Sequence, residues 1–356
     1  MKRSKPTRTG LSRTAVAASL ATLVIVLGLR LGAAWFGQAE SSPALLTPDE
    51  GPYLIGLQPG ETADRVVAVA RAGAGAAVEV AVLPHLPGYT ARGAVSPDGR
   101  YLAVVIATAG TPAQPAAELL VVDLWNGRVR SLAGGLPYLQ DPVWANDGGS
   151  VVVTREPAPG TVELLRVDLG GRSAIILRRE GVLGVYPVGF TPAGVLYAVL
   201  IDARGSTLLR GTEEVRQLAP GITRDWALSP DGGQLAFVEY AEGRYFGRIV
   251  SLEPGAVSAQ AAAVDDGRQR LGPAWDPRTG RAVFAEDPAP ADGAAAAQAV
   301  AGIDRPLAFA PDGSALAVEH WDGTSFAEPG RPQVQVLRDG KRIPIPVTRV
   351  FGWSAP

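Results

Sequence analysis

The sequence predicts an all-β chain folded as a ring of small antiparallel sheets, a β-propeller, with one hydrophobic helix at its N-terminus. A strand–turn–strand unit typified by Ala94–Val105, AVSPDGRYLAVV, recurs along the chain. Most copies are followed by a second pair of strand-like segments. Four strands in a repeat of roughly 34–50 residues is the composition of one propeller blade.

The strand–turn–strand unit occurs six times in full and once as a half copy. The later copies are Pro142–Thr154, Gly189–Val199, Ala227–Val238, Pro273–Ala285 and Leu307–Glu319, and the half copy is Val350–Pro356. In the first copy Pro97 presets φ at the second turn position, Asp98 tolerates the third and Gly99 takes the fourth. The short apolar segment after each turn predicts a strand buried on both faces.

A bulky apolar residue stands just before each turn. These residues are Val95, Trp144, Phe190, Leu228, Trp275, Phe309 and Trp353. We interpret them as core residues wedged between neighbouring sheets, in preference to aromatic rings that stack on a ligand.

The outer strands of the blades follow the motif copies. They are predicted in Leu119–Leu132, Leu164–Leu177, Leu208–Leu218, Arg248–Gly255 and Gln333–Val347. Asn126-Gly127 and Asp339-Gly340 are two-residue hairpin signals within them. Thr108–Ala116 and Glu286–Gly302 are expected to be loops, the second where outer strands of the fifth repeat should lie, although Ala291–Ala301 is compatible with a short helix.

The two ends of the propeller region complement each other. At the N-terminal end, three strands are predicted with no preceding motif strand: Pro52–Leu57, Asp64–Ala70 and Ala77–Leu83. At the C-terminal end, Val350–Trp353 is a motif strand that no outer strands follow. The last strand is therefore expected to pair with the first blade, which closes the ring and covers otherwise exposed edges. This gives a propeller over 52–356 with seven blades, or alternatively six.

The recurring pattern SPDG…LAFV…VVDL…G…R.L resembles the TolB-type propeller repeat, a relative of the WD repeat. The resemblance covers roughly Pro52 to Pro356. It implies the fold but no particular function, because unrelated proteins use this repeat. TolB itself has an additional N-terminal domain and works with envelope partners, so its specific role is not carried over.

The N-terminal segment predicts export of the propeller. Residues 1–13 are basic, 14–37 form an apolar run interrupted by Arg30, and 38–51 are a short linker. We favour a single-pass membrane anchor in which Arg30 snorkels, with the basic end in the cytoplasm and the propeller extracytoplasmic. The alternative is a cleaved signal peptide and a secreted protein.

Charge and composition exclude several functions. From Glu40 to Pro356 there are 27 basic and 35 acidic residues, a balance that argues against nucleic-acid binding and against charge-driven docking on anionic lipid. The chain has no cysteine, which rules out disulfides and thiolate chemistry.

No catalytic, cofactor-binding or metal-binding residues are assigned from the sequence, and no binding residues are identified. His85 and His320 are expected to be loop or packing residues, and there is no nucleophile elbow for a triad. Asp265, Asp266, Asp287 and Asp292 lack calcium-loop spacing. Asp123 and Asp168 recur with the repeat and are expected to serve turns. We therefore expect no enzyme activity and no cofactor.

What remains is a rigid scaffold. The leading hypothesis is a membrane-anchored, extracytoplasmic propeller that acts as a protein-interaction scaffold for an envelope or membrane protein. A module that binds a sugar, peptide or ion is the alternative, and a metal-dependent lactonase-like or lyase-like enzyme is the third and least favoured. The motif turns, around Pro97, Asp147, Pro192, Pro230, Pro277 and Pro311, are expected to ring one face.

Overall fold

The computed structural model describes Leu46, 51–70, 77–253, the backbone of 262–263, 268–287 and 302–354. The chain divides into two units, Met1–Ser42 and Pro43–Pro356. The basic segment 1–13, the hydrophobic helix expected over 14–37 and most of the linker 38–51 lie outside the described residues. Among the residues that are described, no helix has the length and apolar character needed to span a membrane.

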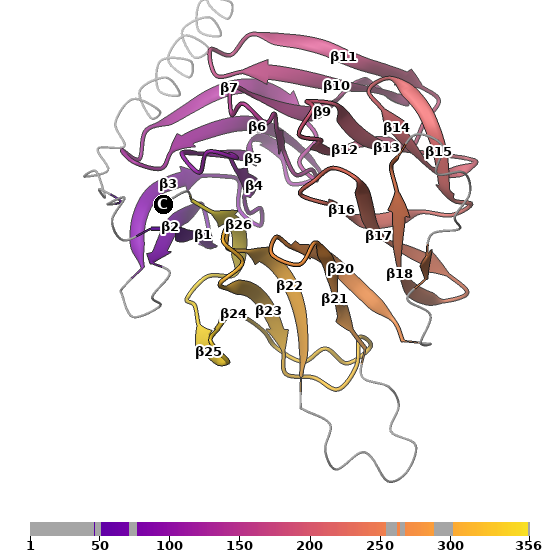
Figure 1. The fold of residues 1–356 in the computed structure, drawn as a ribbon. Helices are drawn as coiled ribbons and strands as arrows, with labels where there is room; N and C mark the ends of the chain where they lie inside the picture. The colour runs from indigo at the N-terminus through magenta and orange to yellow at the C-terminus, as the bar shows by residue number, and fades with distance from the viewer. Residues whose placement is uncertain are drawn as a thin grey trace, which may run out of the picture. The chain divides into compact units, whose positions relative to one another are not determined.

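The described strands form seven antiparallel sheets that follow one another around a ring (Figure 1). Six sheets have four strands each, hydrogen-bonded in chain order apart from the one that β26 joins. The first contains β26 (Arg349–Trp353), β1 (Tyr53–Gln58), β2 (Ala63–Ala70) and β3 (Val78–Pro84), and the second β4 (Arg92–Val95), β5 (Tyr101–Thr111), β6 (Gln114–Asp123) and β7 (Val129–Leu136). The third contains β8 (Val143–Trp144), β9 (Ser150–Ala158), β10 (Thr161–Asp168) and β11 (Ser173–Glu180), and the fourth β12 (Gly184–Phe190), β13 (Leu196–Asp202), β14 (Gly205–Arg210) and β15 (Glu213–Ala219).

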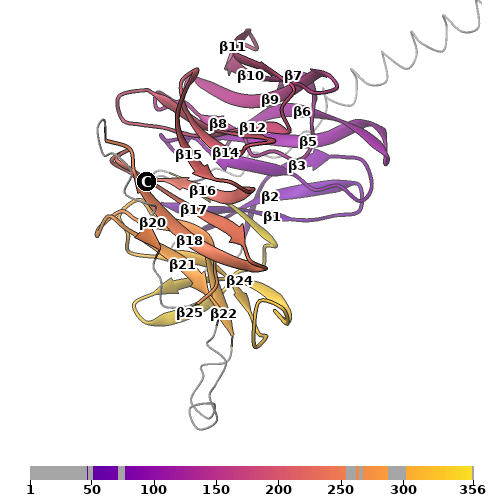
Figure 2. The same ribbon diagram turned by 90° about the vertical axis from the view of Figure 1, so that its right-hand side faces the viewer.

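The remaining sheets complete the ring. One contains β16 (Thr223–Leu228), β17 (Gln234–Ala241), β18 (Arg244–Ser251) and β19 (Ala262–Ala263), and another β22 (Ile303–Phe309), β23 (Leu316–Trp321), β24 (Pro332–Arg338) and β25 (Lys341–Pro344). Between them lies a two-stranded sheet of β20 (Arg270–Asp276) and β21 (Arg281–Glu286). The side view in Figure 2 shows the sheets stacked next to one another.

The structure corrects the expected number of blades. The described residues form six four-stranded blades, not seven, and the repeat Pro273–Ala285 contributes only the two strands β20 and β21. The segment 288–301, which follows β21 and where the sequence suggested a loop or a short helix, lies outside the described residues.

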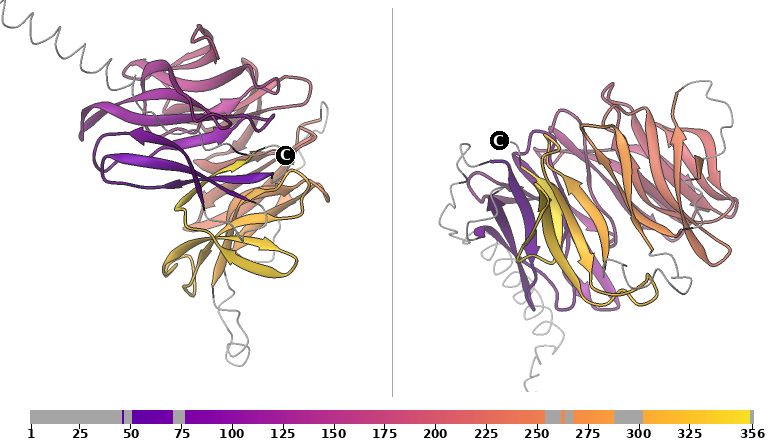
Figure 3. Two further views of the ribbon diagram at one scale, coloured as in Figure 1. Left: turned by 90° about the vertical axis from the view of Figure 1, so that its left-hand side faces the viewer. Right: turned by 60° about the horizontal axis from the view of Figure 1, so that its bottom comes forward.

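The ring closes as the sequence predicts. β26 pairs antiparallel with β1, with Leu54 opposite Trp353 and Leu57 opposite Arg349. Tyr53 and Ser354 extend this pairing, since the Ser354 N–H donates to the Tyr53 carbonyl at 2.8 Å. Figure 3 shows the last, yellow strand beside the indigo strands of the first blade. Closure thereby pairs the edge of β1 that would otherwise be exposed.

The hydrophobic core lies between neighbouring blades. Tyr53, Ile55 and Leu57 of β1 pack with the second blade, while Leu54 packs with β23 and β24 on the other side. This alternation follows from the two-residue period of a strand, and it explains why β1 carries apolar residues on both of its faces.

The tryptophans before the motif turns link adjacent blades. Trp144, Trp275 and Trp353 are each less than a tenth exposed. Their indole N–H groups donate to the carbonyls of Ala94, Ala227 and Ala308 in the preceding blade, at 2.8, 2.9 and 3.2 Å. The interpretation as core is confirmed for these three tryptophans, whereas Val95, Phe190, Leu228 and Phe309 are only partly buried. The indole adds a hydrogen bond that the sequence pattern does not reveal.

One expected loop is a hairpin. Thr108–Ala116 lies almost wholly in β5 and β6, and only Pro112 and Ala113 stand between the two strands. Small residues pair across it, as Ala107 does with Ala117 and Ala109 with Ala116, with a register shift between the two pairs. Backbone hydrogen bonds therefore extend the hairpin despite weak strand propensity.

Candidate functional site

The ring has two ends that differ in chemistry. We call the turn end the one where the innermost strands β4, β8, β12, β16, β20, β22 and β26 run into the motif turns. We call the strand-start end the one where these strands begin. Each innermost strand contacts the next around the ring, including β26 with β4.

Aspartates at the turn end are used by the turns themselves. The carboxylates of Asp98, Asp147, Asp231, Asp276 and Asp312 each accept the backbone N–H two residues on, at 2.9–3.1 Å. Asp123 and Asp168 do the same in the outer hairpins, at 3.1 and 2.9 Å. Asp231 also accepts a hydrogen bond from the Ser229 hydroxyl. This bond, followed by the one from the Gly233 N–H, holds the pKa of Asp231 below its ordinary value. The predicted turn role of Asp123 and Asp168 is confirmed.

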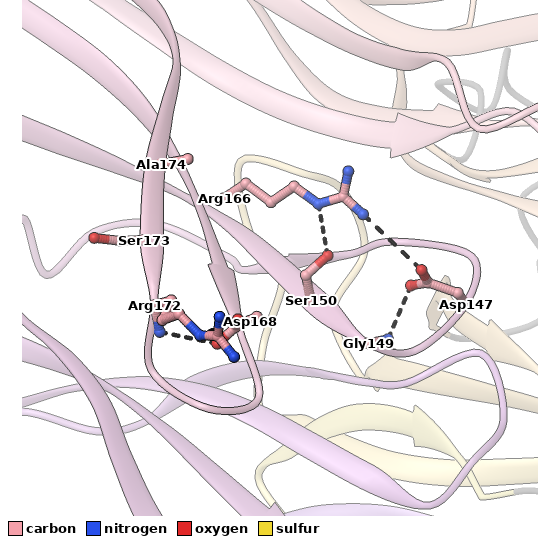
Figure 4. A pocket seen from close by; sticks show the side chains of 8 residues that line it. All are labelled: Asp147, Gly149, Ser150, Arg166, Asp168, Arg172, Ser173 and Ala174. Carbon is pink, nitrogen blue, oxygen red and sulfur yellow. Dashed lines mark hydrogen bonds and ion pairs between the residues drawn. The ribbon is translucent and has the colours of Figure 1, made fainter.

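The turn end also carries a hollow of about 320 Å³ on the third blade. Figure 4 shows Arg166 reaching Ser150 and Asp147, while Arg172 lies beside Asp168. The Arg166 Nε donates to the Ser150 hydroxyl at 2.7 Å, and Arg172 Nε lies 3.5 Å from the Asp168 carboxylate. Because the charged groups here satisfy one another, this hollow is a poor candidate for a ligand site.

His85 is a buried structural residue. Its Nε2 lies 3.2 Å from the Asp64 carboxylate and its Nδ1 lies 2.8 Å from the Leu86 carbonyl, with both side chains of the His85–Asp64 pair fully buried. Asp64 also accepts from the Thr90 hydroxyl at 3.0 Å and the Ala91 N–H at 2.7 Å. The cluster fastens the loop from β3 to β4, so the predicted packing role of His85 is supported.

His320 belongs to a polar row across the blade of β22–β25. Its Nδ1 lies 2.8 Å from Asp304, which also accepts two hydrogen bonds from the Arg342 guanidinium at 2.8 and 2.6 Å. Burial pushes the pKa of Asp304 up, but the hydrogen bonds from Arg342 and His320 outweigh it, so the pKa lies below its ordinary value. Neither histidine bonds to a serine or threonine hydroxyl in the described part of the chain.

The other sequence candidates do not converge. Asp287 accepts from the Gln269 side chain at 3.0 Å and from the Phe326 N–H at 3.1 Å, which ties two loops together. Asp265, Asp266 and Asp292 lie outside the described residues. Within the ranges that are described, no three His, Asp or Glu side chains gather as a metal site would require.

A second hollow, of about 440 Å³, lies between β21 and β22. Its lining includes Arg270, Phe284, Glu286, Ile303 and Asp304. Arg270 donates to Glu286 at 3.1 Å and Asp304 is held by Arg342, so its charges are paired. It lies beside β21, which has no further strand partner in the described residues.

Three arginines meet at the strand-start end. Arg305, Arg349 and Arg92 come from β22, β26 and β4, which are consecutive in the ring. Arg92 lies 3.5 Å from Asp141 and Arg305 lies 3.4 Å from Glu319, whereas the Arg349 side chain has no hydrogen bond or ion pair among the described residues. Burial lowers the pKa of Arg349, and the positive charge of Arg92 lowers it further.

Large aliphatic side chains are exposed at the same end of the ring, in the blades that follow β4. Leu139, Leu183 and Ile222 are 69%, 68% and 60% exposed, and they come from the loops that lead into β8, β12 and β16. These three residues, which we call the apolar arc, thus occupy equivalent loops of consecutive blades. Exposed aliphatic side chains that recur at one end of a scaffold are typical of an interaction surface.

Comparison with solved structures supports the fold. TolB from Acinetobacter baumannii is similar over 85% of this chain, with 17% identity and a TM-score of 0.51. A prolyl endopeptidase is similar over 83%, with 12% identity and a TM-score of 0.53, and a candidate 6-phosphogluconolactonase from Bacteroides uniformis over 85%, with 13% and 0.51. The chain is a β-propeller with a TolB-like fold.

The low identity and partial coverage of these matches limit the conclusions that can be drawn from them. The β-propeller covers 66% of the TolB chain, 50% of the endopeptidase chain and 98% of the lactonase-like chain. No protein-family model matches the sequence, and no curated protein is significantly similar to it. At these identities the neighbours show the architecture of the propeller and not its activity.

Sequence reasoning missed the arginines and the apolar arc. Arg92, Arg305 and Arg349 lie 44 or more residues apart in the sequence. They are related only by their position, because each stands three or four residues before the bulky residue of its motif copy. This shared position becomes visible when the copies are aligned at Val95, Phe309 and Trp353. The apolar arc lies in loops of different length and offers no such signal.

Proposed function

We propose that this protein is a membrane-tethered, extracytoplasmic β-propeller that binds a protein partner of the cell envelope. The apolar arc carries the proposal, because exposed leucine and isoleucine recur in equivalent loops of three consecutive blades, and apolar side chains grouped at one end of a scaffold favour binding to a partner. The TolB-like fold is compatible with this role. The tether is the apolar segment 14–37, and a secreted propeller with a cleaved signal peptide is the alternative.

The tether and the partner are tested separately. Intact mass and membrane partition of the native protein should give the full-length chain in the membrane fraction. A shortened, soluble chain whose mass starts near Trp35 or Glu40 would contradict the tether and favour the secreted form.

The partner test compares matched variants. Leu139→Ser, Leu183→Ser and Ile222→Ser together should abolish the crosslinked adduct that wild-type protein forms in its native membrane. Ile175→Ser with Val215→Ser, which changes exposed residues on the outer strands β11 and β15, should leave that adduct intact. An adduct unaffected by the triple change would overturn the role of the apolar arc.

We further propose that binding, and not catalysis, is the task of this propeller. Its described histidines serve a buried loop and a polar row, and its paired carboxylates are engaged in turns and ion pairs. A stoichiometric metal in protein purified without chelator would contradict this and favour an enzyme.

A further inference from the structure

The arginines at the strand-start end lie at the same level of neighbouring strands. A Cβ on Gly352 would lie 3.4 Å from the Cβ of Val95, and one on Gly93 would lie 3.3 Å from Phe351. β26 and β4 therefore run side by side in the same direction. Counting back three residues from Gly352 and from Val95 gives Arg349 and Arg92, which brings both arginines to the beginning of their strands.

The third arginine adds its charge from the other side of β26. The Trp353 indole bonds to Ala308 of β22, and Arg305 lies three residues before Ala308. Its positive charge acts on Arg349 and contributes to lowering the pKa of that guanidinium. Arg349 is thus flanked by like charges on both neighbouring strands.

The cluster carries more positive charge than its acids neutralise. Asp141 partners Arg92 and Glu319 partners Arg305, while Arg349 is half-buried and has no partner in the described structure. Arg92 Nε is moreover the one buried side-chain nitrogen or oxygen of the described residues that has no hydrogen bond. A buried donor without an acceptor and an unpaired half-buried cation both cost free energy.

We propose that Arg349, assisted by Arg92, binds a carboxylate group of a ligand at the strand-start end of the propeller. One carboxylate supplies the single negative charge that the cluster lacks, and its two oxygens match the paired N–H groups of a guanidinium. A phosphate, which carries about 1.5–2 negative charges at neutral pH, would leave the cluster with excess negative charge. This site goes beyond partner binding by the apolar arc and does not depend on it.

The carboxylate has two possible sources that experiment separates: a small free acid, or the C-terminus of a peptide. Calorimetric titration of the full-length protein with acetate, with acetyl-Leu-Ala-Leu and with the C-terminal amide of that peptide distinguishes them. Similar affinity for acetate and the peptide acid indicates a small free acid. At least tenfold tighter binding of the peptide acid indicates a chain terminus that also contacts apolar side chains.

In either case the amide should bind at least tenfold more weakly than the peptide acid. Equal binding of acid and amide would overturn the proposal. Tighter binding of inorganic phosphate than of acetate would overturn the assignment to a carboxylate.

Variants place the site on the named residues. Arg349→Gln should weaken acid binding at least tenfold, and Arg349→Lys several-fold, because lysine keeps the charge but lacks the paired donors. Arg172→Gln, which alters an almost fully exposed arginine at the turn end, is the matched control and should bind as wild type. Since Arg349→Gln removes a charge flanked by like charges, its melting temperature should equal or exceed that of wild type. Unchanged binding in both Arg349 variants would overturn the proposal.

These results are separable from those on the partner. Replacing the apolar arc by serine should leave acetate binding unchanged. If carboxylate binding is absent but the crosslinked adduct forms, the carboxylate site has failed and the partner surface stands. If the adduct is absent but carboxylate binds, the partner surface has failed and the carboxylate site stands.

Discussion

At the scale of single residues, Asp64 is a buried carboxylate with several hydrogen-bond partners. It is fully buried and accepts hydrogen bonds from the Thr90 hydroxyl and the Ala91 N–H, while His85 lies 3.2 Å away. Asp64→Ala leaves these buried donors without an acceptor, which costs about 1–3 kcal/mol for each group that stays unsatisfied.

Urea denaturation monitored by circular dichroism measures this cost as a loss in the free energy of unfolding. The control is Glu180→Ala, which removes an exposed carboxylate from β11 and should change stability by less than about 0.5 kcal/mol. Equal stabilities of the two variants would show that the buried cluster is dispensable.

Asp304 makes the stability of its blade depend on pH. Hydrogen bonds from Arg342 and His320 outweigh burial and depress its pKa, so its contribution is full above the unfolded value of about 4 and is lost as pH falls through the lower folded value. Arg342→Gln removes one donor and raises that pKa. The difference in stability between pH 7 and pH 3 should therefore shrink.

Urea titrations at the two pH values test this, with Arg210→Gln, an exposed arginine on β14, as control. A pH dependence in Arg342→Gln as large as in wild type would contradict the role of that hydrogen bond.

At the scale of elements, the indole groups of the motif tryptophans join one blade to the next. Trp144→Phe keeps a ring in the core but leaves the Ala94 carbonyl without its donor. We expect a loss of about 1 kcal/mol beyond that of Trp125→Phe, because the Trp125 indole makes no hydrogen bond in the described structure. The difference between the two variants in thermal or urea unfolding measures the bond, and no difference would refute it.

Repeats and turns explain what the sequence could and could not predict about these elements. Asp339 and Gly340 have φ of 50° and 71°, as a two-residue hairpin turn requires, and the sequence signal was sufficient. Thr108–Ala116 was misjudged because backbone pairing across β5 and β6 overrides the weak propensity of alanine and proline. The number of blades was overestimated because the fifth repeat was counted as a whole blade although Glu286–Gly302 was expected to be a loop.

At the scale of the whole molecule, the closing strand and the binding surfaces depend on the ring. β26 comes from the C-terminus and brings Arg349 beside Arg92, 257 residues earlier in the chain. The carboxylate site therefore arises only when the ring is closed, and the apolar arc arises only when three consecutive blades pack together. Neither is a local motif, which is why the sequence predicted the fold but no site.

We expect a partner to cover the strand-start end of the propeller. The most direct measurement is photo-crosslinking in living cells, with p-benzoylphenylalanine placed singly at Leu139, Leu183 and Ile222, and at the exposed positions Ile175 and Val215 of the outer strands. The same partner adduct should form from the first three positions and not from the other two. Adducts from Ile175 or Val215 and none from the apolar arc would place the partner on the outer strands and contradict the account.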